Sequence, residues 1–589
     1  MIGSISLKHR LNLALLIAAF ARFEAHAVFL DPNKCAQTNL RLGSEVSFRM
    51  SSPEPPGRPR VAAGNLLQSR HRLVWSLRHE LLRDGPEDCL TLPLPVDELA
   101  YDVEVTPTYD GVTDYGPHSL RANERVGDLA IQQMHHYRFT HDILPARAVL
   151  SGKIGILRME LGRQDAPRWG EAIGFRLLST IEPTDLRAGH PAVEPSTEQK
   201  IRLWMMRLIL FDLDTEVLFS LGDLKIKELD AFIVPGVIDA AVTRVPSFAS
   251  PLGPNVPRPE DFGARLEIDR LAKTWRATRA GIRLEASLWM HTIRFAHYHM
   301  VSDLPTTRLR ISPIQIDLGG LCRLDGDLAQ LAACVQDTTL ALEFPTQHVT
   351  GLSFVPKLRG TGELSRTVTP YLDAAMFWSE RVAVASDFSS ATLGNMILAA
   401  NRDGSDAWGA VRHRRVLRWV FGFTWIPTLP EGKLLLVNAQ YSHAHVLGLD
   451  PGLLGSSSAL DGLFEALLPD VPLSVMQGDT ETFTLGGMWS PPAVPFLGVE
   501  ALRFSPMFVY DTRGVWVLVP SIETLPFQGL TLSLKYGNVI GNPVGPGVLR
   551  DRDIVWLRLD FDFQLPTRLR PGDDVTFRDL LPVEVAPAL

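Results

Sequence analysis

The segment between residues 162 and 187 holds a dense mixture of charged and aromatic side chains that could act on a solute. Arginine and carboxylate groups form strong paired hydrogen bonds, and rings of such charges select ions in narrow pores. The segment could therefore form a constriction inside a channel, or it could be an ordinary turn whose charges stabilise the fold. The lumen and constriction candidates are Arg163, Gln164, Trp169, Glu171, Phe175, Asp185 and Arg187.

Catalysis has little support in this sequence. It lacks a G-x-S-x-G nucleophile elbow, an H-E-x-x-H metal pair, a phosphate-binding loop and a G-x-G-x-x-G fingerprint. We expect a protein that is not an enzyme, with no catalytic residue, no metal and no cofactor. The alternative is a hydrolase carried on a barrel, which would need a histidine base or metal ligands. Three histidine groups could supply them: His135, His136 and His141; His291, His297 and His299; or His443 and His445. Asp212 and Asp214 are a candidate carboxylate pair, but such residues more often cap a turn.

The elements that would position these residues are strands with strict alternation. In residues 554–565 the odd positions are apolar and most even positions are charged or polar, and residues 530–536 and 435–442 repeat the pattern. Successive strand side chains point to opposite faces, so one face of each segment meets an apolar medium and the other meets water. About 10 residues is also the length of a tilted strand that crosses a bilayer. Residues 417–425 add an aromatic row of the kind found at barrel girdles.

Further strand candidates determine the expected number of strands in the barrel wall. Residues 66–81 could form a helix or a strand, and the alternation from Leu73 to Leu81 favours the strand. Other candidates at residues 201–210 and 282–291 continue the period of two. We expect an all-β fold, a transmembrane antiparallel barrel of about 16 strands, within a range of roughly 14 to 18.

Composition agrees with one large barrel. The chain has 589 residues, yet we find no linker that divides it. Charged residues make up only 21%, but no window approaches the roughly 18 uncharged apolar residues of a spanning helix. The net charge of -8 includes no polybasic stretch, which argues against nucleic acid as a partner.

The first residues are typical of an export signal. Lys8 and Arg10 precede a short apolar run that ends in Ala25, His26 and Ala27. We expect a signal peptide at 1–27, an N-terminal arm at 28–41, the outer-membrane barrel at 42–566 and a C-terminal tail at 567–589. The localisation expected is the cell outer membrane, with its lipid as a partner.

Four cysteines remain after the signal, an even number for an oxidising compartment. Cys322 and Cys334 flank a short loop and are the favoured pair by proximity. Cys35 and Cys89 could then join the arm to an early loop, although other pairings and free thiols stay open.

A motif resemblance adds to this interpretation. The chain contains three short motifs: Gly162-Arg163-Gln164, Trp169-Gly170-Glu171, and residues 182–187 with Pro183, Asp185 and Leu186. Together they resemble the motif of a large Gram-negative outer-membrane β-barrel family of unknown function. Glu182 stands where that family carries Asn. The resemblance implies an outer-membrane location. It also implies a part in moving hydrophobic or lipid-like molecules, alongside an inner-membrane exporter and a periplasmic partner.

We therefore expect a channel or transporter component that moves small or lipid-like hydrophobic molecules across the outer membrane. One alternative is a surface-display or adhesion barrel with a blocked lumen, and the less favoured one is the barrel-borne hydrolase. A periplasmic β-rich binding protein would follow if the apolar strand faces turned inward.

Overall fold

In the part of the chain that the computed structural model describes, nearly all regular structure is β-strand. The exception with defined bounds is one 3-10 helix, η4 (Trp275–Ala277), and no helix in the described residues is long and apolar enough to cross a membrane. The described residues are 36–49, 66–82, 96–110, 146–172, 178, 182–183, 200–211, 224–241, 265–268, 273–302, 306–311, 338–358, 367–382, 396, 399, 402–403, 406–408, 412–429, 433–448, 479–491, 501–527, 530–541 and 553–564.

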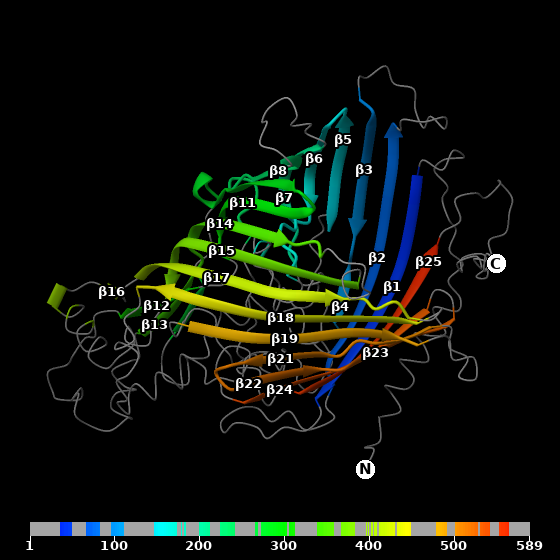
Figure 1. The fold of residues 1–589 in the computed structure, drawn as a ribbon. Helices are drawn as coiled ribbons and strands as arrows, with labels where there is room; N and C mark the ends of the chain where they lie inside the picture. The colour runs from blue at the N-terminus through cyan, green and yellow to red at the C-terminus, as the bar shows by residue number, and fades with distance from the viewer. Residues whose placement is uncertain are drawn as a thin grey trace, which may run out of the picture.

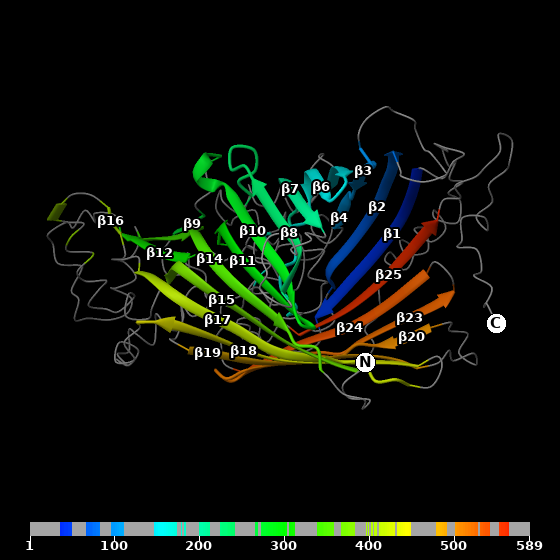
Figure 2. The same ribbon diagram turned by 45° about the horizontal axis from the view of Figure 1, so that its top comes forward.

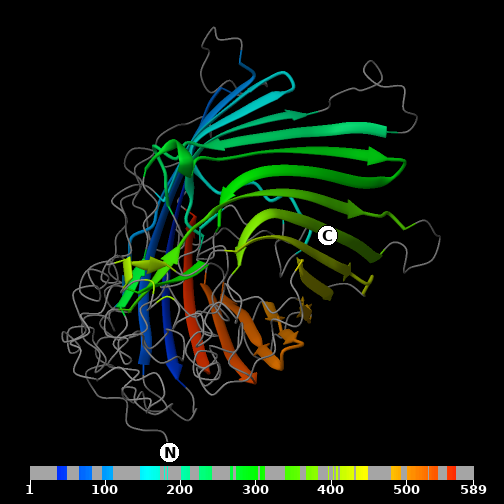
Figure 3. The same cartoon turned by 90° about the vertical axis from the view of Figure 1, so that its left-hand side faces the viewer.

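The main sheet is antiparallel and closes on itself. It contains 21 strand segments, and β1 (Ala36–Arg49) pairs with β25 (Ile554–Gln564) so that Leu42 lies opposite Phe561. Figures 1 and 3 show the blue first strands beside the red last strand, with the other wall strands following in colour order. A closed sheet leaves no unpaired edge in the wall.

Three wall strands are interrupted at Pro107, Pro506 and Pro520, because proline cannot donate a backbone hydrogen bond to the ladder. With each broken strand counted once, the wall has 18 strands, which confirms the predicted barrel at the upper end of its range. The broken strands are β3 (Glu98–Val105) with β4 (Thr108–Asp110), β20 (Ala501–Phe504) with β21 (Met507–Asp511), and β22 (Val515–Val519) with β23 (Ser521–Phe527). The unbroken ones besides β1 and β25 are β2 (Leu66–Leu82), β5 (Arg147–Ile154), β6 (Leu157–Gln164), β7 (Leu203–Phe211), β8 (Leu224–Val234), β10 (Arg279–Leu288), β11 (His291–Val301), β14 (Thr346–Val355), β15 (Val368–Val382), β17 (Arg412–Trp425), β18 (Leu434–Leu447), β19 (Asp479–Ser490) and β24 (Leu530–Gly541).

The two faces of the wall differ as the alternation predicts. On the inner face Arg558 of β25 lies opposite Glu45 of β1, whereas on the outer face Leu559 lies opposite Ser44. The outer face therefore presents a band of large apolar side chains. Exposed members of this band include Leu73, Leu150, Met159, Leu161, Ile282, Phe295, Phe421, Phe483, Leu485, Leu518 and Leu534.

The two ends of the barrel also differ. At one end neighbouring strands are joined by tight turns, as between β5 and β6 and between β10 and β11, where Trp289 has a positive φ of 57°. At the other end the connections are long, notably residues 165–202, 235–278 and 302–345. Bacterial outer-membrane barrels have this asymmetry, with short periplasmic turns and long external loops.

A second, four-stranded sheet lies at the long-connection end (Figure 2). It has the order β16 (Ala407–Trp408), β12 (Thr306–Ile311), β13 (Thr338–Glu343) and β9 (Arg265–Ile268), and β9 runs parallel to β13. Its strands come from three different long connections. The sheet thus ties those connections together beyond the wall.

Several local expectations have an outcome in the fold. Residues 66–81 form the strand β2, as predicted, and β1 begins at Ala36, inside the range expected to be an arm. The signal at 1–27 and the tail at 567–589 lie outside the described residues and stay predictions.

Candidate functional site

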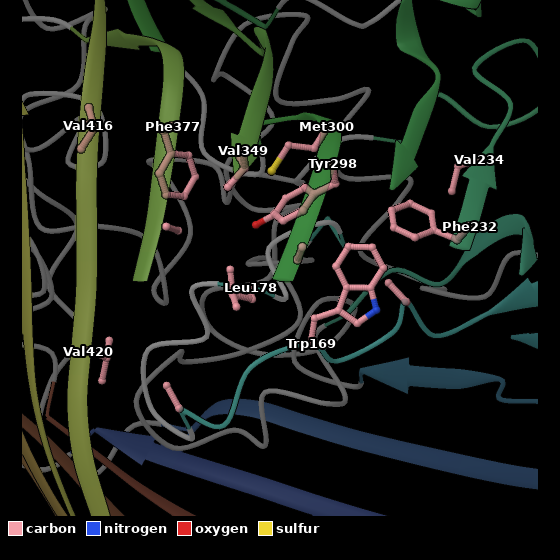
Figure 4. Packing of buried hydrophobic residues seen from close by; sticks show 14 of the residues in the cluster. Trp169, Leu178, Phe232, Val234, Tyr298, Met300, Val349, Phe377, Val416 and Val420 are labelled. Carbon is pink, nitrogen blue, oxygen red and sulfur yellow. The ribbon is translucent and has the colours of Figure 1, made fainter. Parts of the chain in front are cut away.

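The chain that follows β6 turns into the barrel and packs against its inner wall. Trp169 and Leu178 are fully buried, and Ala166 and Ala172 nearly so. Figure 4 shows Trp169 and Leu178 among wall side chains that point toward them, including Tyr298 of β11. We call residues 165–172 the inner segment. The wall side of this core consists of Leu203, Met205, Phe232, Val234, Ala296, Tyr298, Met300, Val349, Tyr371, Ala375, Phe377, Val416, Val420 and Val446.

Trp169 is the central contact of the inner segment. Its ring centroid lies 5.2 Å from that of Phe232 and 5.7 Å from that of Tyr298. Its indole Nε1 donates a hydrogen bond of 2.9 Å to Oδ2 of Asp230, whose side chain has no exposed surface. Gly281 makes room for the ring, because a Cβ there would lie 2.7 Å from Trp169 Cη2.

A buried carboxylate on the wall strand β15 binds the backbone of the inner segment. Oδ2 of Asp373 on β15 accepts hydrogen bonds of 2.8 Å from the backbone N–H groups of both Glu171 and Ala172. Asp373 has no exposed surface. Gly170 permits this approach, since a Cβ at that position would lie 2.6 Å from Asp373 Oδ2. Two charge-assisted hydrogen bonds accepted by one carboxylate fix both the position and the direction of the segment.

A ladder of charged side chains crosses the inner wall beneath these contacts. Arg207 on β7 donates two hydrogen bonds of 2.9 Å to the carboxylate of Asp230, and Arg283 on β10 lies 3.8 Å from the same group. Further along, Arg294 on β11 bridges Glu285 at 2.7 Å and Glu171 of the inner segment. Buried charges are tolerated when they are paired in this way.

The two ends of the region around the inner segment are also fastened. Arg202 pairs with Glu104 on β3 at 2.6 Å and with Asp165 at 2.9 Å. Glu182 accepts a hydrogen bond from the backbone N–H of Ala166. Burial raises the pKa of Glu182 from 4.5 to about 7, opposed by the hydrogen bond from Ala166. Asp165 raises this pKa further, whereas Lys200 and Arg168 lower it.

The inner face of β2, β3, β5 and β6 has a different character. It carries a series of ion pairs whose cations remain substantially exposed, from 37% for Arg147 to 59% for Arg78. Water therefore reaches this wall, whereas the apolar inward rows that begin at the neighbouring strand β7 are covered by the inner segment. The pairs are Arg78–Glu80 at 3.4 Å, Arg147–Asp102 at 3.4 Å, Lys153–Glu98 at 3.7 Å and Arg158–Glu160 at 3.2 Å.

The predicted lumen residues do not all lie together. Trp169 and Glu171 lie in the inner segment, and the buried Gln164 donates to the carbonyl of Met205. Arg163 differs from the expectation, because it lies opposite Ala148 and Trp204, in the outer-face row of Leu161. Its Nε donates to the carbonyl of Arg202 at 3.4 Å. Phe175, Asp185 and Arg187, together with Cys35, Cys89, Cys322 and Cys334, lie outside the described residues.

The histidine groups do not form a metal centre in the described part of the chain, which contains no cluster of three or more potential ligands. His443 and His445 do share a strand face, as expected, and His443 lies 3.6 Å from Glu481. His297 and His299 lie on the outer face of β11. His135, His136, His141, Asp212 and Asp214 lie outside the described residues.

Sequence reasoning missed the wall partners of the inner segment, Asp230, Asp373 and Arg294, and the arginines Arg207 and Arg283 that pair with Asp230. Each sits in a strand at an inward position, where a polar residue is ordinary for a barrel. One feature of the sequence could have indicated the docked segment: Phe232 and Val234 lie on the same inward row as Asp230. Apolar side chains on an inward row indicate that something covers them.

Comparisons with known proteins find similar barrels among solved structures. OccK5 (OpdH) of Pseudomonas aeruginosa has a TM-score of 0.39 and 10% identity over 92% of this chain and 99% of its own. The corresponding values for a BenF-like porin from Pseudomonas fluorescens Pf-5 are 0.40, 10%, 91% and 99%. Those for OmpF of Salmonella typhi are 0.35, 8%, 91% and 100%.

No family model and no curated protein matches this chain, so the motif resemblance stays a prediction. The architecture rests on the strand register of this chain itself. The chain is a closed antiparallel β-barrel of 18 strands.

Proposed function

We propose that this chain is an outer-membrane channel for small polar solutes, with its passage between the inner segment and the charged wall of β2, β3, β5 and β6. The observation that carries the proposal is the docking of the inner segment. Trp169, Glu171 and the backbone of Ala172 attach to one side of the barrel. The ion pairs on the other side stay exposed.

The exposed chemistry favours polar solutes over the lipid-like ones that the family resemblance implies. Trp169 would be the natural apolar contact for a lipid, yet it has no exposed surface. The exposed inner side chains are instead arginines, lysine and carboxylates, such as Lys153 at 39% and Glu98 at 53%. Such groups hydrogen-bond hydrated or charged solutes and offer no apolar track.

The location follows from the outer face. A closed barrel with an apolar outer band satisfies every backbone group of its wall internally, which is the requirement for spanning a bilayer. We expect the protein in the outer-membrane fraction, extracted by detergent and not by salt. Recovery as a soluble periplasmic protein would contradict this location.

The channel is tested by releasing the inner segment. Asp373→Leu removes the acceptor of two backbone hydrogen bonds, and each buried donor left without a partner costs about 1 to 3 kcal/mol. We expect a larger single-channel conductance in planar bilayers and faster uptake of small sugars by vesicles. The matched control is Asp511→Asn, since Asp511 is also a buried carboxylate but pairs with Arg513 in the turn after β21.

Folded barrel would be quantified in both variants by heat-modifiable mobility on gels. Equal conductance in the wild type and Asp373→Leu, at equal folded barrel, would remove the inner segment from the passage. Absence of any conductance in the wild type would favour the display barrel, for which the four-stranded sheet at the long-connection end is the supporting observation.

A further inference from the structure

A polar patch interrupts the apolar outer face at the long-connection end of β11, β14, β15 and β17. We call it the rim patch. On β11 and β14, His299 lies opposite His348 and His297 lies opposite Thr350. Phe295 and Ile282, on the same outer face, are 55% and 47% exposed, so the patch adjoins the lipid-facing band. Its six members are His297, His299, His348, Thr350, Trp378 and Arg415.

Ring and hydrogen-bond contacts join these side chains into one surface. The ring centroid of His348 lies 4.6 Å from that of His299 and 6.1 Å from that of His297. Oγ1 of Thr350 lies 3.0 Å from His297 Nδ1 and accepts a hydrogen bond of 2.8 Å from Trp378 Nε1. These contacts fix the rings and leave His297, His348 and Trp378 exposed.

Arg415 gives the patch its permanent charge. Its guanidinium carbon lies 5.7 Å from the centroid of the Trp378 ring, a cation–π arrangement. No ion pair of Arg415 occurs within the described residues, and the patch itself contains no carboxylate. An exposed arginine that has no ion pair among the described residues, with imidazole and hydroxyl groups around it, is complementary to an anion.

We propose that the rim patch binds the phosphate of a lipid headgroup in the leaflet around the long-connection end. This rests on the membrane-spanning barrel of the proposed function. Tryptophan and arginine concentrate at the depth of the headgroups, and arginine pairs with phosphate through two hydrogen bonds. The apolar band below the patch would hold the acyl chains of the same lipid. A lipid is therefore favoured over a free anion, which would gain nothing from that band.

The matched control region lies on β18. His443 and His445 also face outward at the long-connection end, with ring centroids 6.3 Å apart. They differ from the rim patch because the carboxylate of Glu481 lies 3.6 Å from His443 and supplies an anion already. Removing these imidazoles changes the outer face by a similar amount without touching Arg415.

The test measures lipid retained by the purified full-length protein in neutral detergent, using native mass spectrometry. The probes are phosphatidic acid and diacylglycerol with the same acyl chains, and inorganic phosphate as a competitor. We expect phosphatidic acid to be retained over diacylglycerol. Arg415→Gln should lower that retention about five-fold, as for one cation lost at an anionic membrane surface. A variant with both His443→Gln and His445→Gln should retain it normally.

Three outcomes would overturn the lipid site. The first is retention of diacylglycerol equal to that of phosphatidic acid, and the second is unchanged retention of phosphatidic acid in Arg415→Gln. The third is displacement of the lipid by millimolar phosphate alone, which would indicate a free-anion site. Bilayer conductance of the same preparations separates this result from the channel proposal. Normal conductance with unselective lipid retention rejects the rim patch only. Loss of conductance in the wild type rejects the channel whatever lipid is retained.

Discussion

Replacing Trp169 by alanine should release the inner segment while leaving the wall intact. The indole is fully buried, and truncating such a side chain costs about 3 to 5 kcal/mol. That cost applies to the docking of the segment, because the pairing of the wall strands does not involve Trp169. Each 1.4 kcal/mol changes an equilibrium about ten-fold, so the ratio of docked to released segment should fall roughly a hundred- to several-thousand-fold.

The effect is measurable as current. We expect Trp169→Ala channels in planar bilayers to have a larger and noisier single-channel conductance, since the released segment no longer occupies one side of the lumen. Trp419→Ala is the control of the same residue type. Trp419 is only partly buried and contacts Tyr441 on the outer face, with ring centroids 5.1 Å apart.

Wild-type conductance in Trp169→Ala, with an unchanged amount of heat-modifiable barrel, would contradict a docked segment that limits the passage. The segment would then be held without its main contact, and the passage would be limited elsewhere. A loss of folded barrel in Trp169→Ala alone would instead show that the segment is needed to assemble the wall. In that case the milder variant Trp169→Phe, which keeps an aromatic ring but removes the hydrogen bond to Asp230, gives the decisive conductance measurement.

Three further predictions concern charge, pH and lipid contact. Glu171→Gln should lower the preference of the channel for cations without changing the fold, because Glu171 is 40% exposed and Arg294 keeps Glu285 as a second carboxylate partner. Reversal potentials in a salt gradient measure this preference. The outer-face variant Arg163→Gln is the control. Conductance should rise between about pH 4.5 and about pH 7 and level off above that. Glu182 has a pKa of about 7 in the docked state against a usual 4.5, so its neutral form stabilises docking. This contribution is complete below pH 4.5 and is lost as the pH rises through about 7. Glu182→Gln should abolish the change. Leu559→Arg should lower the free energy of unfolding in lipid vesicles by roughly 2 to 4 kcal/mol, and an unchanged urea midpoint would place this residue away from lipid.

The strands could be predicted from the sequence because the period of two is a local signal. In β25 the pairing puts Leu557 and Leu559 on the outer face and Arg558 on the inner one, as the alternation indicates. The ambiguous residues 66–81 resolve as a strand because a helix would have left the polar side chains between Leu73 and Leu81 facing the same apolar medium. Strand number was harder to predict, since prolines such as Pro506 divide one wall strand into two short segments.

The inner segment could be located from the sequence, but its attachment could not. The stretch from 162 to 187, which contains the inner segment, stood out because it breaks the alternation. Their partner Asp373 lies 202 positions away from Glu171, and nothing in the local pattern marks it among the polar inward residues of other strands. Only the order and register of the wall bring β15 opposite the segment. The same register moves Arg163, one residue from the buried Gln164, to the outer face.

The inward rows themselves explain why the segment docks on one side. A water-filled barrel needs polar side chains inside, and β2, β3, β5 and β6 supply them as exposed ion pairs. From β7 to β18 the inward rows instead include Met205, Phe232, Tyr298 and Val349, which would be costly in contact with water. Covering them stabilises the docked segment. The segment also adds two partners to the charged ladder, Trp169 for Asp230 and Glu171 for Arg294. The asymmetry of the wall thus directs the segment to the apolar rows and leaves the charged rows uncovered, on the side where we propose the passage.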